Sequence, residues 1–287
     1  MRILITGASG TVGRFLAARL AGEGNHVTAL GRRPAVDTAL EFARFDLSKM
    51  SPRLPEADAL VHCALHHDPG KFRGGQGDDP ERFRKLNVEG TRALFQAAKM
   101  AGCCKTVFLS SRAVYGDARR GETLHETDAP EPDSLYGQVK LEGERALEEL
   151  CDTRFAGIAL RVTGVYGTPP GMDRHKWSSL FDDYRSDVEI EPRCATEVHG
   201  DDLAAAVSLV LQTPERGFDV FNVSDLLLDR RDLLTLVSEC SGIKGVLPAR
   251  ATTLPGVMDA SKLRQVGWLP GGLGKLKAFV EAGCRGE

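Results

Sequence analysis

Short apolar runs alternate with stretches of helical periodicity through the first half of the chain. The runs have the length and flanking residues of buried strands, and they predict strands at 2–5, 25–30, 42–45, 58–64, 106–109 and 158–162. Apolar residues at helical spacing fill 15–20, 80–101 and the segment that follows Ser134. Strands that alternate with helices predict a parallel sheet covered on both faces, which is a doubly wound α/β fold.

The second half of the chain adds fewer elements of this kind. The pattern predicts a late strand at 219–223. It also predicts a helix that ends at Leu211 and two more near 231–240 and near 273–283. We find no internal repeat and no independent second domain. We therefore expect one α/β domain over 1–167, which also receives 195–224, and a small substrate-binding lobe from 168–194 and 225–287.

Composition places the chain among globular proteins and excludes several partners. The 287 residues are 42% hydrophobic and 27% charged, with a net charge of −3. That charge gives no reason to expect nucleic acid or an anionic membrane as partner. No apolar run approaches the roughly 20 residues of a membrane span, and no signal peptide precedes the first strand. Seven scattered cysteines form no C-x-x-C pair, and the His66-His67 pair has no further ligand. We expect a cytoplasmic, reduced protein without a metal site.

A glycine-rich turn lies between the first strand and the first helix. Gly7, Gly10 and Gly13 are spaced G-x-x-G-x-x-G, and the turn also contains Ser9, Thr11 and Val12. A turn of this kind brings backbone N–H groups and a helix N-terminus to a pyrophosphate. The strand–turn–helix context therefore predicts a dinucleotide site, which a glycine trio alone would indicate only weakly.

A second set of polar residues lies after the fifth strand. Ser111 stands at the carboxyl end of that strand, where open α/β sheets place catalytic residues. Tyr136 and Lys140 are spaced i and i+4 on the following helix, so they share one face. Tyrosine has an ordinary pKa of about 10, and a lysine ammonium beside it favours the tyrosinate. The set predicts Tyr136 as an acid/base in hydride transfer, with Ser111 orienting the substrate oxygen.

Together these motifs resemble the extended branch of the short-chain dehydrogenase/reductase superfamily. The segment 110–116 matches its S-S-x-x-V-Y-G, and Tyr136 with Lys140 matches its Y-x-x-x-K. The branch holds sugar-nucleotide epimerases, dehydratases and reductases on a Rossmann fold. The resemblance implies that Tyr136 and Lys140 also contact the nicotinamide ribose. It further implies that Asn87, in an N-V-x-G-T segment, supports the active site and a proton-relay water.

The resemblance also implies where the cofactor lies on the rest of the sheet. An acidic–apolar pair, Asp46-Leu47, would lie against the adenine ring. A segment similar to the family's V-x-H-x-A would run beside the cofactor through Cys63, Ala64 and Leu65. The adjacent His62 is expected to be a strand residue.

The residues after the second strand predict which dinucleotide is preferred. An acidic residue at this place binds the ribose 2′-hydroxyl, whereas arginine suits a 2′-phosphate. Gly31, Arg32 and Arg33 stand here instead of an acid. We therefore expect NADP to be preferred, with NAD also able to bind.

Two departures from the family bear on the substrate. Gly164 replaces an asparagine that contacts the diphosphate sugar in the relatives, and the 168–197 stretch is short. The chain alone therefore does not choose between a free sugar and a nucleotide sugar. Arg112-Ala113 replaces the Asp-Glu pair of the dehydratases, which disfavours dehydration. We expect an oxidoreductase or epimerase. The alternative is a regulator that senses NADP(H) without turnover, although such proteins typically lose the tyrosine or lysine.

Two larger-scale features are also expected. The Gly-rich loop 66–79 is long enough to act as a lid over the substrate. Related enzymes form homodimers through the helices at 80–101 and 134–150. In this chain Leu141, Ala146 and Leu150 would supply part of the apolar face of such a dimer.

Overall fold

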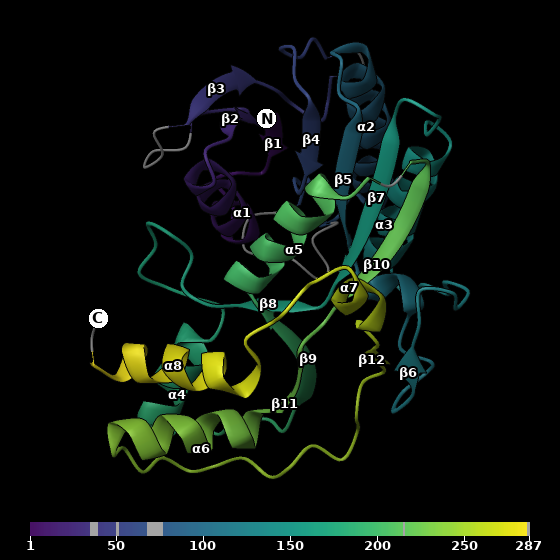
Figure 1. Ribbon diagram of the computed structural model, residues 1–287. Coiled ribbons are helices and arrows are strands. Elements are labelled where there is room, and N and C mark those ends of the chain that lie inside the picture. Colours follow the sequence, from purple (N-terminus) through teal and green to yellow (C-terminus); the bar gives the residue numbers. More distant parts are fainter. Residues whose placement is uncertain (35–39, 50–51, 68–76, 215, 286–287) are drawn as a thin grey trace.

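The structure is a computed structural model, and it describes all residues except 35–39, 50–51, 68–76, 215 and 286–287. Its described part contains a seven-stranded parallel sheet in the order β10-β7-β5-β4-β1-β2-β3 (Figure 1). The strands are β1 (Arg2–Thr6), β2 (His26–Gly31), β3 (Glu41–Arg44), β4 (Ala59–His62), β5 (Lys105–Ser111), β7 (Ala156–Val162) and β10 (Phe218–Val223). The doubly wound α/β prediction is confirmed, and the predicted strands are found within a few residues of their expected ends.

Helices cover both faces of this sheet, as Figure 1 shows. Helices α1 (Thr11–Gly22) and α5 (Gly200–Gln212) pack on one face; α2 (Pro80–Met100) and α3 (Leu135–Glu148) pack on the other. Successive side chains of a strand point to opposite faces. Ile3 and Ile5 accordingly join the core beneath α1 and α5, while Leu4 joins the core beneath α2 and α3.

The helices on the second face begin at capping residues that are visible in the sequence. The Asp79 carboxylate accepts a hydrogen bond from Arg82 N, and Pro80 occupies the first turn of α2. The Ser134 hydroxyl accepts one from Gly137 N at the start of α3. These caps fix where Asn87, Tyr136 and Lys140 lie along their helices.

A smaller layer packs against the carboxyl ends of the central strands. A three-stranded sheet contains β8 (Gly164–Tyr166), β9 (Cys194–His199) and β11 (Leu226–Asp229). Helices α4 (Ser178–Arg185), α6 (Arg230–Ser241) and α8 (Gly272–Arg285) share a separate core that includes Trp177 and Leu233. The remaining elements are η1 (Arg112–Tyr115), β6 (Thr123–Leu124), β12 (Val257–Met258) and α7 (Ser261–Gln265). No helix of the described ranges is long and apolar enough to cross a membrane.

The order of the strands determines where a ligand can enter. The chain runs outward from β1 through β2 and β3, and then returns to place β4 on the other side of β1. This reversal opens a crevice at the carboxyl ends of β1 and β4, where open α/β sheets bind their ligands. The glycine turn follows β1, and Cys63, Ala64 and Leu65 follow β4.

The apolar dimer face expected on α3 is wrong in its residues. Leu141 packs with Val114, Tyr115 and Leu124, and Ala146 is fully buried within the chain. Leu150 packs against the core beneath α2 and α3. These side chains therefore pack within the protomer, Leu141 against η1 and β6 and Leu150 just beyond the end of α3.

Candidate active site

The glycine turn has the geometry that a phosphate cradle requires. Gly7 has a φ of +71°, which is a left-handed conformation that favours glycine. A Cβ on Gly13 would lie 2.0 Å from Gly7 O, so α1 approaches the turn more closely than any side chain permits. Gly10 precedes α1 without a side-chain cap, and the first turn holds no acidic residue. The first N–H groups of α1 and the positive end of its dipole are therefore available to an anion.

A cavity of about 910 Å³ extends from this turn along the sheet edge. It brings together every residue predicted to contact the cofactor: Gly7, Ser9, Gly10, Thr11, Val12, Gly13, Arg32, Arg33, Asp46, Leu47, Cys63, Ala64, Leu65, Tyr136 and Lys140. The cavity runs from an uncapped helix N-terminus to the catalytic candidates, so the residues present fit a dinucleotide. Burial raises the pKa of the Cys63 thiol to about 12, which leaves it protonated and unreactive.

The far end of this cavity is basic. Arg32 and Arg33 follow β2, and Arg44 lies at the end of β3 beside them. Neither Arg32 nor Arg33 makes a side-chain hydrogen bond or ion pair with another described residue. Asp46 accepts a hydrogen bond from Ser48 N at 2.9 Å; this bond, with the Arg32 charge, lowers the pKa of its carboxyl. The aspartate is thus held as an anion beside Arg32.

Ser111, Tyr136 and Lys140 line the opposite end of the same cavity. Lys140 Nζ donates to Leu109 O at 2.7 Å and lies 5.8 Å from the centroid of the Tyr136 ring. Burial lowers the pKa of Lys140 to about 8, with the nearby Glu144 carboxylate opposing the shift. The ammonium is therefore fixed next to the tyrosine and still carries its proton at pH 7.

Two polar residues of the neighbouring elements, His62 and Asn87, do not line this cavity. His62 is fully buried. Its Nδ1 lies 2.7 Å from Thr6 Oγ1, and its Nε2 lies 2.9 Å from Thr91 Oγ1. Burial lowers its pKa to about 3. Asn87 bonds both the N–H and the carbonyl of His66, at 2.7 and 2.8 Å. Its amide therefore holds the backbone of His66, which lines the cofactor cavity, and a catalytic role for Asn87 stays a prediction.

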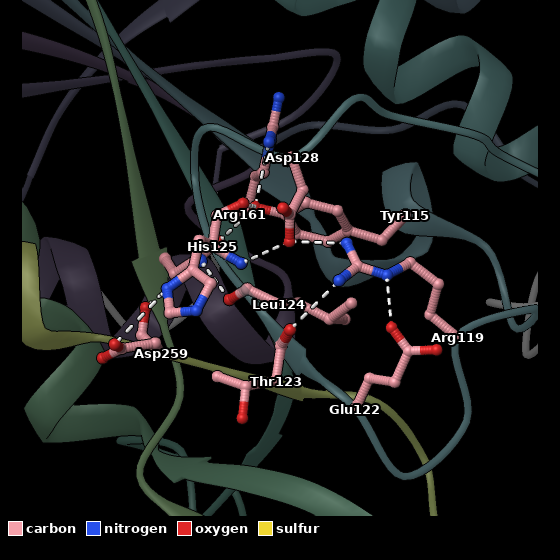
Figure 2. A network of polar contacts seen from close by, with 10 residues as sticks. Tyr115, Arg119, Glu122, Thr123, Leu124, His125, Asp128, Arg161 and Asp259 are labelled. Carbon is pink, nitrogen blue, oxygen red and sulfur yellow. Dashed lines mark hydrogen bonds and ion pairs between the residues drawn. The ribbon is translucent and has the colours of Figure 1, made fainter.

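A buried network fixes the active-site helix to the sheet. Glu144, one turn beyond Lys140, accepts from Ser110 Oγ and pairs with Arg161 of β7 at 2.8 Å. Arg161 also donates to the Tyr115 hydroxyl at 2.9 Å, and that hydroxyl donates to His125 O at 3.0 Å. Figure 2 shows how these contacts continue to the segment after η1. There Arg119 pairs with Asp128 and Glu122, as the figure also shows.

A second cavity of about 630 Å³ opens on the other side of the catalytic residues. Ser111, Tyr136, Val162 and Thr163 line both cavities, so a molecule in each would meet at Ser111 and Tyr136. The second cavity has a basic lining that comprises Arg112, Arg120, Lys176, Arg193 and Arg250, against the carboxylates of Asp117 and Glu197. Arg112 pairs with Asp117, Arg250 with Asp232 and Lys176 with Glu197.

The sequence did not identify most of this second lining. Arg120, Lys176, Arg193 and Glu197 come from separate segments, so no local motif joins them. Arg44 was missed at the first cavity for the same reason, because only the β2–β3 pairing places it beside Arg32. The one signal available in the sequence was a charged residue without an evident partner close to the end of a predicted strand. The expected lid at 66–79 lies mostly outside the described residues; within it, His66 and His67 line the cofactor cavity.

Comparisons with known proteins agree with this geometry. The family model described as "NAD dependent epimerase/dehydratase family" matches residues 3–224. The chain is 33% identical over 170 residues to a dTDP-6-deoxy-L-talose 4-dehydrogenase of Kitasatospora kifunensis, covering 58% of this chain and 53% of that protein. It is 27% identical over 183 residues to methionine adenosyltransferase 2 subunit beta of Bos taurus, covering 63% and 52%. The chain thus spans about half the length of these relatives.

Solved structures are similar over the whole chain. The structure of MoeE5 in complex with UDP-glucuronic acid and NAD has a TM-score of 0.82 and 27% identity, with 100% of both chains covered. MoeE5 in complex with UDP-glucose and NAD gives the same TM-score at 26% identity, covering 100% of this chain and 99% of that one.

Proposed function

The chain belongs to the NAD dependent epimerase/dehydratase family, within the extended short-chain dehydrogenases/reductases, and on this premise we propose that it is an NADP-preferring oxidoreductase or epimerase of a sugar nucleotide. One observation carries the proposal: Ser111 and Tyr136 line both the cavity that begins at the glycine turn and the polar second cavity. A carbinol carbon in the second cavity would then face the position of a nicotinamide.

The residues at the boundary of the two cavities can transfer a proton at the substrate oxygen and stabilise the tyrosinate that results. A bound nicotinamide supplies the hydride acceptor or donor. Tyr136 takes the proton from the substrate oxygen as the tyrosinate, and in the reverse direction the protonated phenol returns it. Lys140 stabilises the tyrosinate with a charge that the Leu109 carbonyl holds in place. Ser111 donates a hydrogen bond to the same substrate oxygen and orients the carbon.

The preference for NADP is proposed from the basic end of the cofactor cavity. Arg32 and Arg33 offer planar, charge-assisted donors to a 2′-phosphate, and Arg44 adds a third guanidinium. Gly31 ends β2 without a carboxylate that would repel the phosphate. NAD can still bind, because the other residues that line the cavity would contact parts of the cofactor that NAD and NADP share.

A nucleotide diphosphate on the substrate is proposed from the second cavity. Arg120 and Arg193 line it and make no side-chain ion pair with any described residue. Two unpaired guanidinium groups suit a diphosphate, whose oxygens accept bidentate hydrogen bonds. The MoeE5 complexes with UDP-sugars support the same substrate class.

Two other functions are less well supported. A regulator that only senses NADP(H) would not need the complete Ser111, Tyr136 and Lys140 set at the boundary of the two cavities. A dehydratase needs acids beside the catalytic hydroxyl, whereas Arg112 is held there by Asp117 and by Gly256 O at 3.1 Å.

The proposal is tested by incubating the protein with UDP-glucose or UDP-glucuronic acid and each nicotinamide cofactor. Net oxidation or reduction changes the nicotinamide absorbance at about 340 nm, and epimerisation appears as a new sugar in proton NMR. We expect one of these signals with NADP(H) at least as strongly as with NAD(H). Cofactor binding without either signal, across a panel of sugar nucleotides, would favour the regulator.

A further inference from the structure

An ion pair forms part of the wall of the second cavity. Lys176 Nζ lies 2.5 Å from Glu197 Oε2, and both residues line the cavity with Ser111 and Tyr136. The Glu197 side chain is 6% exposed and that of Lys176 is 31% exposed. A carboxylate this deeply buried is held charged only by strong partners, and Lys176 is one.

Gly164 provides the space for this pair. Gly164 of β8 is in register with Glu197 of β9. A Cβ at position 164 would lie 2.5 Å from Glu197 Oε2 and 2.7 Å from Lys176 Nζ. Its backbone does not have a positive φ, so the conflict is one of space: a side chain at 164 would displace the ends of the Glu197 and Lys176 side chains. Gly164, Lys176 and Glu197 therefore form one unit, in which the ion pair occupies the volume of a side chain at 164.

One oxygen of the Glu197 carboxylate, Oε1, is available to accept a hydrogen bond. Oε2 accepts from Lys176, whereas Oε1 takes no hydrogen bond from any described residue. The neighbouring hydroxyl of Thr163 is already used, because it donates to Thr196 O at 2.7 Å. An anionic oxygen in such a wall gains from a donor on the molecule that fills the cavity.

The charge of the unit indicates which donor fits. Lys176 neutralises Glu197, so the pair does not oppose a diphosphate held elsewhere in the cavity. An acidic group placed against Oε1 would be repelled, whereas a hydroxyl would donate to it. A sugar ring carries such hydroxyls beside its reacting carbon.

We propose that Glu197 determines specificity by accepting a hydrogen bond from a ring hydroxyl of the substrate, and that Lys176 is a positioning residue that fixes the carboxylate. This inference rests on the proposed function, because it requires a sugar ring in the second cavity. A site built to bond a hydroxyl rejects the analogue that lacks it, since its own polar group is then left unpaired.

The test is titration calorimetry of the NADP⁺-saturated protein with UDP-glucose and its 2-, 3- and 6-deoxyfluoro analogues. Fluorine replaces the hydroxyl without the ability to donate. We expect one analogue to bind wild type at least about tenfold more weakly than UDP-glucose, the size of a hydrogen bond to a charged group. In Glu197→Ala this difference should shrink to less than about twofold, because the acceptor is gone.

Two further variants make the result interpretable. Glu189→Ala removes an exposed carboxylate outside the cavity and should keep the wild-type pattern. Glu197→Gln keeps the shape and a neutral acceptor, so it should reduce the discrimination even if the alanine variant does not fold. An equal loss for all four ligands in the Glu197 variants, or no discrimination in wild type, would overturn the inference alone. Failure of wild type to bind any sugar nucleotide, with cofactor binding intact, would overturn the proposed substrate class as well.

Discussion

At the scale of single residues, Arg32 is the most direct test of cofactor preference. Its guanidinium is exposed at the end of the cofactor cavity and makes no ion pair within the described part of the chain. A hydrogen bond to a charged group contributes about 1.5–3 kcal/mol, and solvent screening favours the lower end. Arg32→Ala should therefore weaken NADPH binding by about tenfold and leave NADH nearly unchanged.

Titration calorimetry of both cofactors measures this difference. Arg53→Ala is a matched control, because Arg53 is an exposed arginine that lines neither cavity. Equal wild-type affinities for the two cofactors, or an equal loss for both in Arg32→Ala, would show that Arg32 does not bind the 2′-phosphate.

His62 carries a prediction about acid stability. Burial lowers its pKa to about 3 in the folded protein, against about 6.5 when unfolded. Between these values the unfolded chain binds one more proton, so acid favours unfolding. As the pH drops below about 6, His62 alone should lower the free energy of unfolding by up to about 1.4 kcal/mol per pH unit.

The His62→Gln variant isolates that contribution, since glutamine does not titrate. Urea unfolding at pH 4.5 and pH 7 should show a smaller acid loss for the variant than for wild type. The same loss in both proteins would mean that His62 does not set the acid sensitivity, whatever the variant costs at neutral pH.

At the scale of elements, helix α3 depends on its buried anchor to the sheet. Removing one partner of a buried ion pair costs about 3–5 kcal/mol, because the other charge is left unpaired. Arg161→Met should have this effect, since among the described residues it leaves the buried Glu144 with Ser110 as its remaining hydrogen-bond donor. The surface pair of Arg92 and Glu149 joins α2 to α3, and Arg92→Met should cost at most about 1 kcal/mol. Urea unfolding compares the two variants, and equal losses would contradict the anchoring role.

The central sheet was predictable because most of its strands are buried and appear as apolar runs, whereas the edge strand β3 is largely exposed. The strands β8, β9 and β11 were not predictable, because their pairing depends on neighbours distant in the sequence. The same division holds for the site. The cofactor residues lie on local motifs after successive strands. Glu197 joins Ser111 and Tyr136 only through the packing of β9 against β8, which no single segment encodes.

At the scale of the whole molecule, a homodimer through α2 and α3 stays a prediction, but its interface would now be the charged surface of these helices. The apolar residues expected at the interface pack within the chain, where Leu141 and Ala146 are buried and Leu150 is half-buried. Lys85, Glu89 and Arg145 are among the side chains exposed along these helices. An interface between charged surfaces is screened by salt. Sedimentation at micromolar concentration should show a dimer at low salt and a weaker one in about 1 M salt. A monomer under both conditions would exclude this dimer.

The division of the chain into an α/β domain and a small lobe remains a proposal. The separate core of α4, α6 and α8 supports it, and the second cavity lies between residues of both parts. That arrangement would let the cofactor domain stay constant while the lobe determines the substrate.

The central claim, that Tyr136 is the acid/base of hydride transfer at the boundary of the two cavities, is tested most directly by the turnover of Tyr136→Phe. The rate is measured with the sugar nucleotide that wild type converts, alongside the NADPH affinity. General acid/base catalysis contributes about 10²–10⁴-fold, so turnover should fall at least about a hundredfold while the affinity stays within about twofold. A variant that retains more than about a tenth of the wild-type rate would contradict the assignment.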